Sequence, residues 1–287
     1  MIWLIGNKGM LGSDVELILK DSGVDYFSSD MEVDICNYSQ LEAFAKGKKI
    51  KWIINCSAYT AVDKAEEERE KAFDINSQGV MNIAGIAKHI KAKLIHISTD
   101  YVFDGVKEGP YFETDITNPL SIYGQSKLEG EKNIQNTIAN YFIIRISWLY
   151  GQGGSNFVHT MVRLFKEKEE LKVIDDQWGS PTFTKDVAKV ILKIIKDDSE
   201  NYGIYNFTNE GKTSWHLFAK EIYRLSRQYG IVQKDVNILP IKTENYIVKT
   251  SRPKNSYLSK EKIEKELNVN LKKWEDSLDD YLKNFNK

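Results

Sequence analysis

The sequence predicts an α/β fold in which a doubly wound parallel sheet is joined to a smaller C-terminal α+β lobe. Short apolar runs suited to buried strands alternate with helical stretches from residue 2 to about residue 150. This alternation implies right-handed crossovers and a parallel sheet that helices cover on both faces. Beyond residue 150 a glycine-rich loop and separated helices make the pattern less regular, which indicates a second packing unit.

The first element is Ile2-Trp-Leu-Ile5, a short apolar run typical of a buried parallel strand. The turn Gly6-Asn-Lys-Gly-Met-Leu-Gly12 and an amphipathic helix follow directly. Glycines let the backbone approach a pyrophosphate, and the helix N-terminus offers free N–H groups. Strand, turn and helix therefore predict a Rossmann-type dinucleotide-binding unit. The G-x-x-G-x-x-G spacing resembles the extended branch of the short-chain dehydrogenase/reductase superfamily.

Periodicity and turn residues place the other elements. We expect strands at 25–29, 51–56, 94–98 and 141–146, and helices at 39–46, from 63 past 70, around 75–90 and around Tyr123. Later helices are expected at about 158–168, 184–197, 214–228 and 272–285, with extended pieces near Tyr205 and Ile238. This predicts a dinucleotide-binding Rossmann domain at 1–150, with a return segment near 171–200, and a mainly substrate-binding lobe at 151–287.

Composition narrows the class of protein. Lys and Arg number 40 against 41 Asp and Glu, so the net charge of −1 gives no electrostatic case for nucleic acid or an anionic membrane. The two cysteines, Cys36 and Cys56, form no disulfide framework or metal-ligand spacing. No stretch has the length of a transmembrane helix, and the first strand begins at residue 2, where a signal peptide would lie. We expect a cytoplasmic protein without nucleic-acid or membrane partners.

A tyrosine and a lysine indicate the chemistry. Tyr123 is the only one of the fifteen tyrosines that is followed by Lys four residues later, at Lys127. On a helix this spacing puts both side chains on one face. A nearby ammonium lowers the pKa of a phenol, which can then exchange a proton with a carbonyl oxygen as hydride arrives. A solvated helix can carry the pair by chance, so its weight comes from the neighbouring features.

Asp30 suggests which dinucleotide is bound. It follows the last glycine of the turn by 18 residues, at the expected end of the second strand. A carboxylate there can accept both hydroxyls of the adenosine ribose and favours NAD over NADP, although an aspartate in a plain turn is the alternative. Asp34 and Ile35 are placed to meet the adenine. Because Ser28-Ser29 leave room for a 2′-phosphate that Lys8 can reach, either NADH or NADPH is expected.

A threonine completes the expected reducing site. Ser98-Thr-Asp-Tyr101 ends a predicted strand, which puts Thr99 where it can hydrogen-bond a substrate carbonyl beside Tyr123. Taken alone, such a threonine more often makes a local turn bond. Together with the glycine turn and Lys127, it gives a Thr/Tyr/Lys set.

Longer motifs bring the resemblance closer. Together they resemble the family of dTDP-4-dehydrorhamnose reductases, in order from residue 6 to residue 256. The segments are Asn55-Cys-Ser-Ala-Tyr-Thr-Ala-Val-Asp-Lys-Ala-Glu66, Ile97-Ser-Thr-Asp-Tyr-Val-Phe-Asp-Gly105, Tyr123-Gly-Gln-Ser-Lys127, Arg145-Ile-Ser-Trp-Leu-Tyr150, Asn156-Phe-Val158, Asp176-Gln-Trp-Gly-Ser-Pro-Thr182 and Arg252-Pro-Lys-Asn-Ser256.

The resemblance implies reduction of the C4 ketone of dTDP-4-dehydro-L-rhamnose, a nucleotide-sugar substrate, to dTDP-L-rhamnose. The positions that match catalytic residues of the family are Thr99, Tyr123 and Lys127. Those that match its cofactor-binding segments are Gly6, Gly9, Met10, Leu11, Asp30, Asp34, Ser57, Ala58 and Tyr59. Those that match its sugar pocket are Thr60, Asp100, Tyr101 and Trp148. Trp148 offers a ring face to a 6-deoxy sugar, or else is an ordinary core tryptophan. Arg252 can meet the diphosphate.

One departure from the family concerns a metal. Some members form dimers around a magnesium ion that carboxylates hold. Asp14 falls at one such position, but Lys185 occupies another, and a lysine cannot coordinate magnesium. We therefore expect no bridging metal, and either a monomer or a weak homodimer.

Other functions remain open at this stage. A sugar-nucleotide dehydratase usually carries an acid after the Thr-Asp pair, where this chain has Tyr101. A 4-epimerase or a reductase of another nucleotide-linked 4-keto-6-deoxy sugar remains possible. So does a regulatory subunit that binds a dinucleotide without turning it over, although an intact Thr/Tyr/Lys set favours an enzyme.

Overall fold

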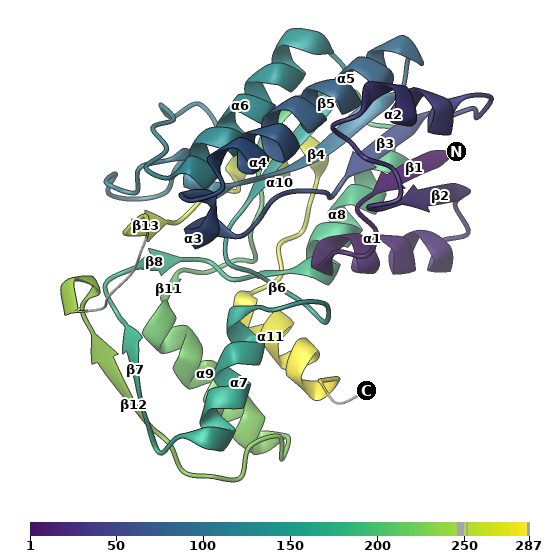
Figure 1. The fold of residues 1–287 in the computed structure, drawn as a ribbon. Helices are drawn as coiled ribbons and strands as arrows, with labels where there is room; N and C mark the ends of the chain where they lie inside the picture. Colours follow the sequence, from purple (N-terminus) through teal and green to yellow (C-terminus); the bar gives the residue numbers. More distant parts are fainter. Residues whose placement is uncertain (246–249, 251, 286–287) are drawn as a thin grey trace.

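The computed structural model describes residues 1–245, 250 and 252–285 and is built around one parallel sheet (Figure 1). The strand order is β10-β5-β4-β3-β1-β2, and every neighbouring pair is parallel. The strands are β1 (Ile2–Ile5), β2 (Tyr26–Ser29), β3 (Trp52–Asn55), β4 (Lys93–Thr99), β5 (Tyr141–Ile146) and β10 (Gly203–Asn206).

Helices cover both faces of the sheet. One face packs on α1 (Met10–Asp21), α8 (Thr184–Lys196) and α10 (Glu261–Leu267), and the other on α2 (Tyr38–Ala45), α5 (Gly79–His89) and α6 (Ile122–Thr137). Alternate residues of β1 serve the two cores, with Ile2 and Leu4 in the first and Trp3 and Ile5 in the second. This period of two is what a strand buried on both faces requires. The predicted fold class is confirmed.

The strand order reverses direction at β1, which lies between β2 and β3. In open α/β sheets, ligands bind outside the carboxyl ends of the strands at such a switch point. The glycine turn after β1, the segment after β3 and the Thr99 end of β4 all lie at that edge. The fold thus brings three predicted site segments to one place.

Two parts of this layer differ from the prediction. The piece near Tyr205 is the edge strand β10, which pairs with β5 although 56 residues separate Ile146 from Gly203. The charged helix expected from residue 63 is broken into α3 (Val62–Ala65) and α4 (Arg69–Phe73), and a π-helix, η1 (Asp74–Gln78), precedes α5. Nothing in the local hydrophobic pattern reports a long-range pairing or a π-helical turn, which tertiary contacts select.

The second unit is an aromatic-rich lobe, below the sheet in Figure 1. Its helices are α7 (Phe157–Glu167), α9 (Trp215–Gln228) and α11 (Trp274–Lys283). Of the two 3₁₀ turns, η2 (Asp100–Val102) follows β4 in the sheet layer, and η3 (Thr243–Asn245) follows β12 (Asn237–Ile241). Its short strands pair as β7 (Glu170–Ile174) with β12 (Asn237–Ile241), β6 (Leu149–Tyr150) with β9 (Thr182–Phe183), and β8 (Trp178–Gly179) with β11 (Thr213–Ser214) and β13 (Asn255–Ser256). We propose a division near residue 150, with α8, β10 and α10 returning to the sheet layer.

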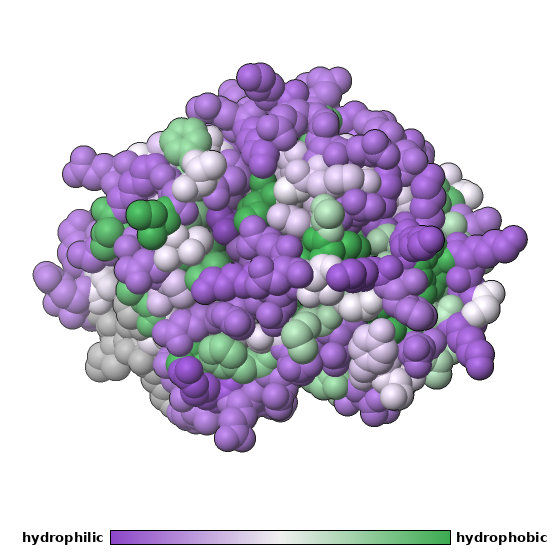
Figure 2. All heavy atoms as spheres, turned by 90° about the horizontal axis from the view of Figure 1, so that it is seen from above, coloured by the Kyte–Doolittle hydropathy of each residue, from purple (hydrophilic) through white to green (hydrophobic). Residues whose placement is uncertain are grey.

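The surface above the sheet is polar. Figure 2 looks down on this side and shows hydrophilic side chains over most of it, with hydrophobic atoms only in small separate patches. Among the residues that the structure describes, no helix is long and apolar enough to cross a membrane.

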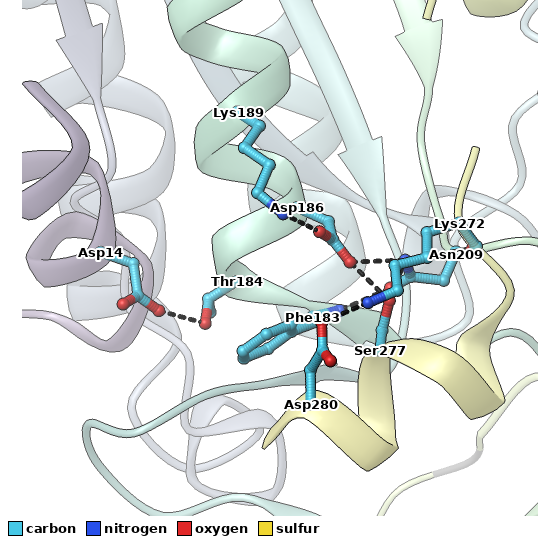
Figure 3. A network of polar contacts seen from close by, with 9 residues as sticks. All are labelled: Asp14, Phe183, Thr184, Asp186, Lys189, Asn209, Lys272, Ser277 and Asp280. Carbon is cyan, nitrogen blue, oxygen red and sulfur yellow. Dashed lines mark hydrogen bonds and ion pairs between the residues drawn. The ribbon is translucent and has the colours of Figure 1, made fainter. Parts of the chain in front are cut away.

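Asp186, near the start of α8, fastens the lobe to the sheet layer (Figure 3). Its Oδ2 accepts hydrogen bonds from Ser277 Oγ at 2.6 Å and Asn209 Nδ2 at 2.8 Å, and Lys189 donates to Oδ1 at 2.9 Å. Asn209 also accepts from the Phe183 N–H at 2.8 Å. Burial raises the pKa of Asp186, but these hydrogen bonds outweigh burial and lower the pKa overall. The carboxylate is therefore stabilised in the folded state.

We predict that Asp186→Ala lowers the free energy of unfolding by about 2–4 kcal/mol, because Ser277 and Asn209 lose a buried acceptor. Lys189→Ala, which removes only the exposed partner, should cost under about 1 kcal/mol. Urea unfolding measures both. A carboxylate with a lowered pKa stabilises the fold fully above its pKa in the unfolded chain, 3.8, and this stabilisation is lost as pH falls through its pKa in the folded protein. The free energies of unfolding of the wild type and Asp186→Ala should therefore converge at low pH. Equal losses for the two variants would contradict this role.

Candidate active site

The glycine turn after β1 leaves no space for side chains. Gly6 has φ +81°, and a Cβ there would lie 2.7 Å from Ser57 N. A Cβ on Gly12 would lie 1.9 Å from the Gly6 carbonyl oxygen. α1 begins at Met10 after Gly9, which supplies no side-chain cap, so the first N–H groups of the helix remain available to an anion. This cradle fits the pyrophosphate of a dinucleotide.

Asp30 lies beside this turn. Its carboxylate accepts hydrogen bonds from the Lys8 N–H at 3.0 Å and the Met31 N–H at 2.9 Å, which ties the end of β2 to the glycine loop. The two serines expected beside a 2′-phosphate, Ser28 and Ser29, already have hydrogen-bond partners. Ser29 is buried and accepts from Trp3 Nε1 at 2.9 Å, and Ser28 Oγ donates to a carboxylate of α1. Strand alternation turns these hydroxyls to opposite faces, where each finds a partner.

The expected adenine residues behave differently from each other. Asp34 is exposed, and its Oδ1 accepts from the Cys36 N–H at 2.9 Å. Ile35 is buried in the core against Gly79, where a Cβ would come within 2.7 Å of Ile35 Cδ1. The side chain of Asp34 thus remains accessible to a ligand, whereas Ile35 mainly packs α5.

The segment after β3 is held by a residue that the sequence did not single out. Asn76 Oδ1 accepts from the Tyr59 N–H at 2.9 Å, and its Nδ2 donates to the Tyr59 carbonyl and to Ser126 Oγ, both at 3.0 Å. Ala58 is half-buried beside it and Thr60 is exposed. The π-helical turn η1 places Asn76 between this loop and α6. π-helical turns are frequent at functional sites, but this one is visible only in the structure.

Tyr123 and Thr99 meet at the carboxyl edge. α6 starts one residue before Tyr123, with Ser121 as its N-cap accepting from the Gly124 N–H at 3.1 Å. Tyr123 faces Thr99 and lies edge-on to Tyr101, with ring centroids 5.5 Å apart. Burial raises the pKa of Tyr123, and Thr99 offsets part of that shift. The phenol therefore keeps its proton near neutral pH, as a general acid must.

Lys127 lies below Tyr123 on the same helix face. It is buried, and its Nζ donates to the Ile97 carbonyl at 2.7 Å. Burial lowers its pKa to about 8, against the charge of Glu131, which raises it. We expected Lys127 to lower the pKa of Tyr123, but burial raises that pKa instead. The reason is that the lysine nitrogen is bound to a strand carbonyl, and its own positive charge is disfavoured by burial.

A buried ion pair fixes α6 against the sheet. Glu131, one turn beyond Lys127, accepts from Arg145 Nε at 3.0 Å and Nη2 at 2.6 Å. Ser98 Oγ donates to Glu131 Oε1 at 2.5 Å. Both charged side chains are at most 3% exposed. A bidentate pair of this kind has one good geometry, so it defines how α6 is rotated toward β4 and β5.

The expected sugar-pocket residues next to Tyr123 carry free polar atoms. Burial raises the pKa of Asp100 to about 6, and its Oδ2 has no hydrogen-bond partner among the described residues. Arg252 Nη2 donates to Asp63 Oδ2 at 3.3 Å. Burial raises the pKa of Tyr101 to about 12, and the charge of Arg252 offsets part of that shift. Within the described chain, Arg252 Nε and Asp63 Oδ1 are likewise without partners. Buried polar atoms left in this way are what a polar ligand satisfies.

Trp148 belongs to a different cluster. Its ring stacks on Trp215 at 3.6 Å between centroids and 15° between planes, in the lobe core. Its backbone is left-handed, with φ +49°, and a Cβ on Gly179 would approach Trp148 Cε2 to 2.7 Å. A strained backbone in a residue this bulky persists only where the surroundings enforce it. The half-buried ring is thus held rigidly at the junction of sheet and lobe.

Asp14 faces Thr184 at the same junction (Figure 3), and Lys185 is close enough to act on the Asp14 carboxylate through its charge. The Thr184 hydroxyl donates to Asp14 Oδ2, and burial raises the pKa of Asp14. Lys185 lowers that pKa slightly through its charge. Among the described residues, no group of three or more His, Cys, Asp and Glu is arranged to hold a metal ion.

The fold and this site define a class of protein. A glycine turn at the switch point of a parallel sheet, with a Tyr and Lys on one helix face and a Thr at the adjacent strand end, is the arrangement of a nicotinamide-dependent oxidoreductase of the extended short-chain dehydrogenase/reductase type.

Comparison with known proteins gives the family. Residues 1–287 match the family described as RmlD substrate binding domain, and the chain belongs to this family. It is 38% identical to the dTDP-4-dehydrorhamnose reductase of Aggregatibacter actinomycetemcomitans, covering 96% of each chain. It is 39% identical to the spore coat polysaccharide biosynthesis protein SpsK of Bacillus subtilis, covering 98% of this chain and 96% of that one. The resemblance seen in the sequence is confirmed.

Solved structures agree. A dTDP-4-dehydrorhamnose reductase from Clostridium acetobutylicum has a TM-score of 0.92 at 41% identity, with 98% of each chain covered. The enzyme of that name from Bacillus anthracis, solved in complex with NADP, has a TM-score of 0.91 at 38% identity, with 98% of this chain and 97% of that one covered.

We predict that Glu131→Ala destabilises the protein by about 3–5 kcal/mol, because it leaves Arg145 buried without its partner. Glu129→Ala, two residues earlier on the exposed side of α6, should change stability by at most about 0.5 kcal/mol. Urea unfolding of both variants compares them. Similar small losses would show that the ion pair does not hold α6.

Proposed function

We propose that this protein reduces the C4 ketone of dTDP-4-dehydro-L-rhamnose with NADH or NADPH and forms dTDP-L-rhamnose. The observation that carries this proposal is the half-buried phenol of Tyr123, which faces Thr99 on a helix whose next turn carries the buried Lys127. Full-length similarity to proteins named dTDP-4-dehydrorhamnose reductase supports the choice of reaction.

The chemistry divides between the cofactor and the protein. A bound nicotinamide supplies the hydride that is added to C4. Thr99 holds the ketone oxygen by a hydrogen bond, and Tyr123 gives that oxygen its proton, so the developing negative charge is neutralised. Lys127 binds the nicotinamide ribose one helical turn below. The raised pKa of Tyr123 suits the reducing direction, because the proton is present at neutral pH.

Three sets of residues complete the proposal. The glycine turn, Asp30, Asp34 and the Ser57–Tyr59 segment hold the dinucleotide. Asp100 and Arg252 present their free polar atoms, and Tyr101 its ring and hydroxyl, to the sugar and its phosphates. Trp148 offers a rigid ring face to the apolar side of the 6-deoxy sugar. We also propose a cytoplasmic location and a monomer or weak homodimer. The free thiols of Cys36 and Cys56 support a reducing compartment.

One experiment decides the reaction. The purified protein is supplied with dTDP-4-dehydro-L-rhamnose generated in situ and with NADH or NADPH, and both cofactor oxidation and product stereochemistry are followed. dTDP-L-rhamnose is the expected product. A C4-epimeric product would indicate another keto-sugar reductase. Dinucleotide binding without oxidation of either cofactor would favour a regulatory, non-catalytic role.

We predict that Tyr123→Phe lowers kcat by about 10²–10⁴-fold, the usual contribution of a general acid, and leaves dinucleotide affinity nearly unchanged. Steady-state kinetics and fluorescence titration measure the two quantities. Tyr38→Phe, the same change at an exposed position of α2, is the control and should retain normal turnover. Near-normal kcat in Tyr123→Phe would remove this tyrosine from the role.

We predict that Asp30→Ala shifts the ratio of kcat/KM for NADPH over NADH upward by about tenfold. A carboxylate about 4 Å from a 2′-phosphate repels it by about 1–4 kcal/mol, and the substitution removes that repulsion. Asp25→Ala, at the exposed position before β2, should leave the ratio unchanged. If Asp30→Ala also leaves it unchanged, the Asp30 carboxylate does not face the ribose.

A further inference from the structure

His96 is a buried titratable group that the proposed reaction does not use. It lies in β4 with no exposed surface, between Asn55 of β3 and Lys127 of α6. Its Nδ1 is 3.0 Å from Asn55 Nδ2, and its Nε2 is 3.3 Å from Lys127 Nζ. The imidazole thus connects the end of β3 to Lys127.

The surroundings define which ring nitrogen carries the proton. The backbone N–H of Ser57 can only donate, and it lies 3.0 Å from Asn55 Oδ1. The amide oxygen of Asn55 is therefore on the Ser57 side, and its NH₂ group faces His96 Nδ1. Since that group donates, Nδ1 accepts. Burial holds the pKa of His96 well below 6.5, so the ring is neutral and its single proton is on Nε2.

In this tautomer the Nε2–H of His96 points toward the Nζ of Lys127. An ammonium group has three donors and no lone pair, so it cannot accept from His96 Nε2–H, whereas a neutral amine can. The Ile97 carbonyl, 2.7 Å from Nζ, accepts from either form. The contact with His96 therefore favours the amine.

The other groups that face Lys127 come from two elements. Glu131 on α6 favours the ammonium, but its charge is already paired with Arg145. Cys56, after β3, is neutral, because burial raises the pKa of its thiol to about 12. His96 on β4 is therefore the polar neighbour that acts against the charged lysine.

We propose that His96, held in its Nε2–H tautomer by Asn55, is a positioning residue that favours the neutral amine of Lys127 and so couples dinucleotide binding to proton uptake by Lys127. This proposal rests on the proposed function, because it takes Lys127 as the residue that meets the cofactor. The phosphates of the dinucleotide add negative charge, which favours the ammonium and drives protonation of the amine.

Linkage gives the sign of the effect. The pKa of Lys127 is lowered to about 8 in the protein, and binding raises it. A group whose pKa rises on binding strengthens binding fully below its free pKa and loses that contribution as pH rises through the bound pKa. Dinucleotide affinity should therefore be constant below about pH 8 and fall by up to tenfold per pH unit above it.

Asn55→Asp reverses the tautomer. One carboxylate oxygen still accepts from Ser57, while the other accepts from His96 Nδ1–H, so Nε2 becomes an acceptor for the ammonium. The pH at which dinucleotide affinity begins to fall should rise by about one unit or more, because one hydrogen bond to the charged form is worth about that much. Isothermal titration across pH measures the shift, and thermal unfolding checks that the variants are folded.

The introduced charge needs its own control. In a His96→Phe background, Asn55→Asp adds the same charge without the imidazole, and a clearly smaller upward shift is expected there. An equal shift in both backgrounds would mean that charge alone acts, and would overturn the proposal. Failure of the wild type to bind either dinucleotide would contradict the proposed function and the coupling together.

The tautomer is tested separately, without cofactor or substrate. Ring-nitrogen chemical shifts of the four histidines, with His96 assigned by its loss in His96→Phe, report which nitrogen is protonated. Protonated Nε2 in the wild type and protonated Nδ1 in Asn55→Asp are expected. Protonated Nδ1 in the wild type would overturn the proposal whatever reaction the protein catalyses.

Discussion

The position of the reactive tyrosine depends on the buried pair of Glu131 and Arg145. Tyr123, Lys127 and Glu131 are successive four-residue steps on α6, so they share one face of the helix. An unpaired charge in the interior is so costly that only rotations of α6 that bring Glu131 onto Arg145 are populated. That same rotation directs Lys127 at β4 and Tyr123 at Thr99. A structural ion pair at one end of the face thereby determines the chemical geometry at the other.

The ion pair defines the rotation of α6, and close backbone contacts define its distance from the neighbouring segments. A Cβ on Gly124 would lie 2.3 Å from the Tyr101 carbonyl oxygen, and one on Gly130 would lie 2.2 Å from that of Asn76. Glycine at these two positions lets the helix sit directly on the η2 turn and on the π-helical turn. Larger residues would move Tyr123 away from Thr99, because packed interiors do not deform gradually.

The sequence predicted those features that local pattern encodes and missed those that depend on distant partners. The strand at 141–146 and the turn at Gly6 were found because burial and glycine chemistry leave a local signal. The pairing of β10, the role of Asn76 and the Glu131–Arg145 pair left none, since each joins segments that are far apart in the chain. The sequence also did not predict that Lys127 Nζ is hydrogen-bonded to the Ile97 carbonyl of β4. Residue spacing shows which face of the helix carries the lysine, but not which group its nitrogen contacts. The Trp148 ring was expected near the sugar, yet its left-handed backbone could not be read from residue type.

The network at Asp186 has a consequence for how the chain folds during synthesis. The hydroxyl of Ser277 that satisfies this carboxylate lies 91 residues later in the chain. Until α11 has left the ribosome, Asp186 at the start of α8 lacks the hydrogen-bond donor Ser277. The strand pairings among β1 to β5 lie within residues 2–146 and need no such late partner, although α8 and α10 later cover one face of these strands. The nascent chain can therefore assemble its nucleotide-binding half first, and the lobe becomes fixed to it only when the last helix arrives, so translation itself orders the two halves in time.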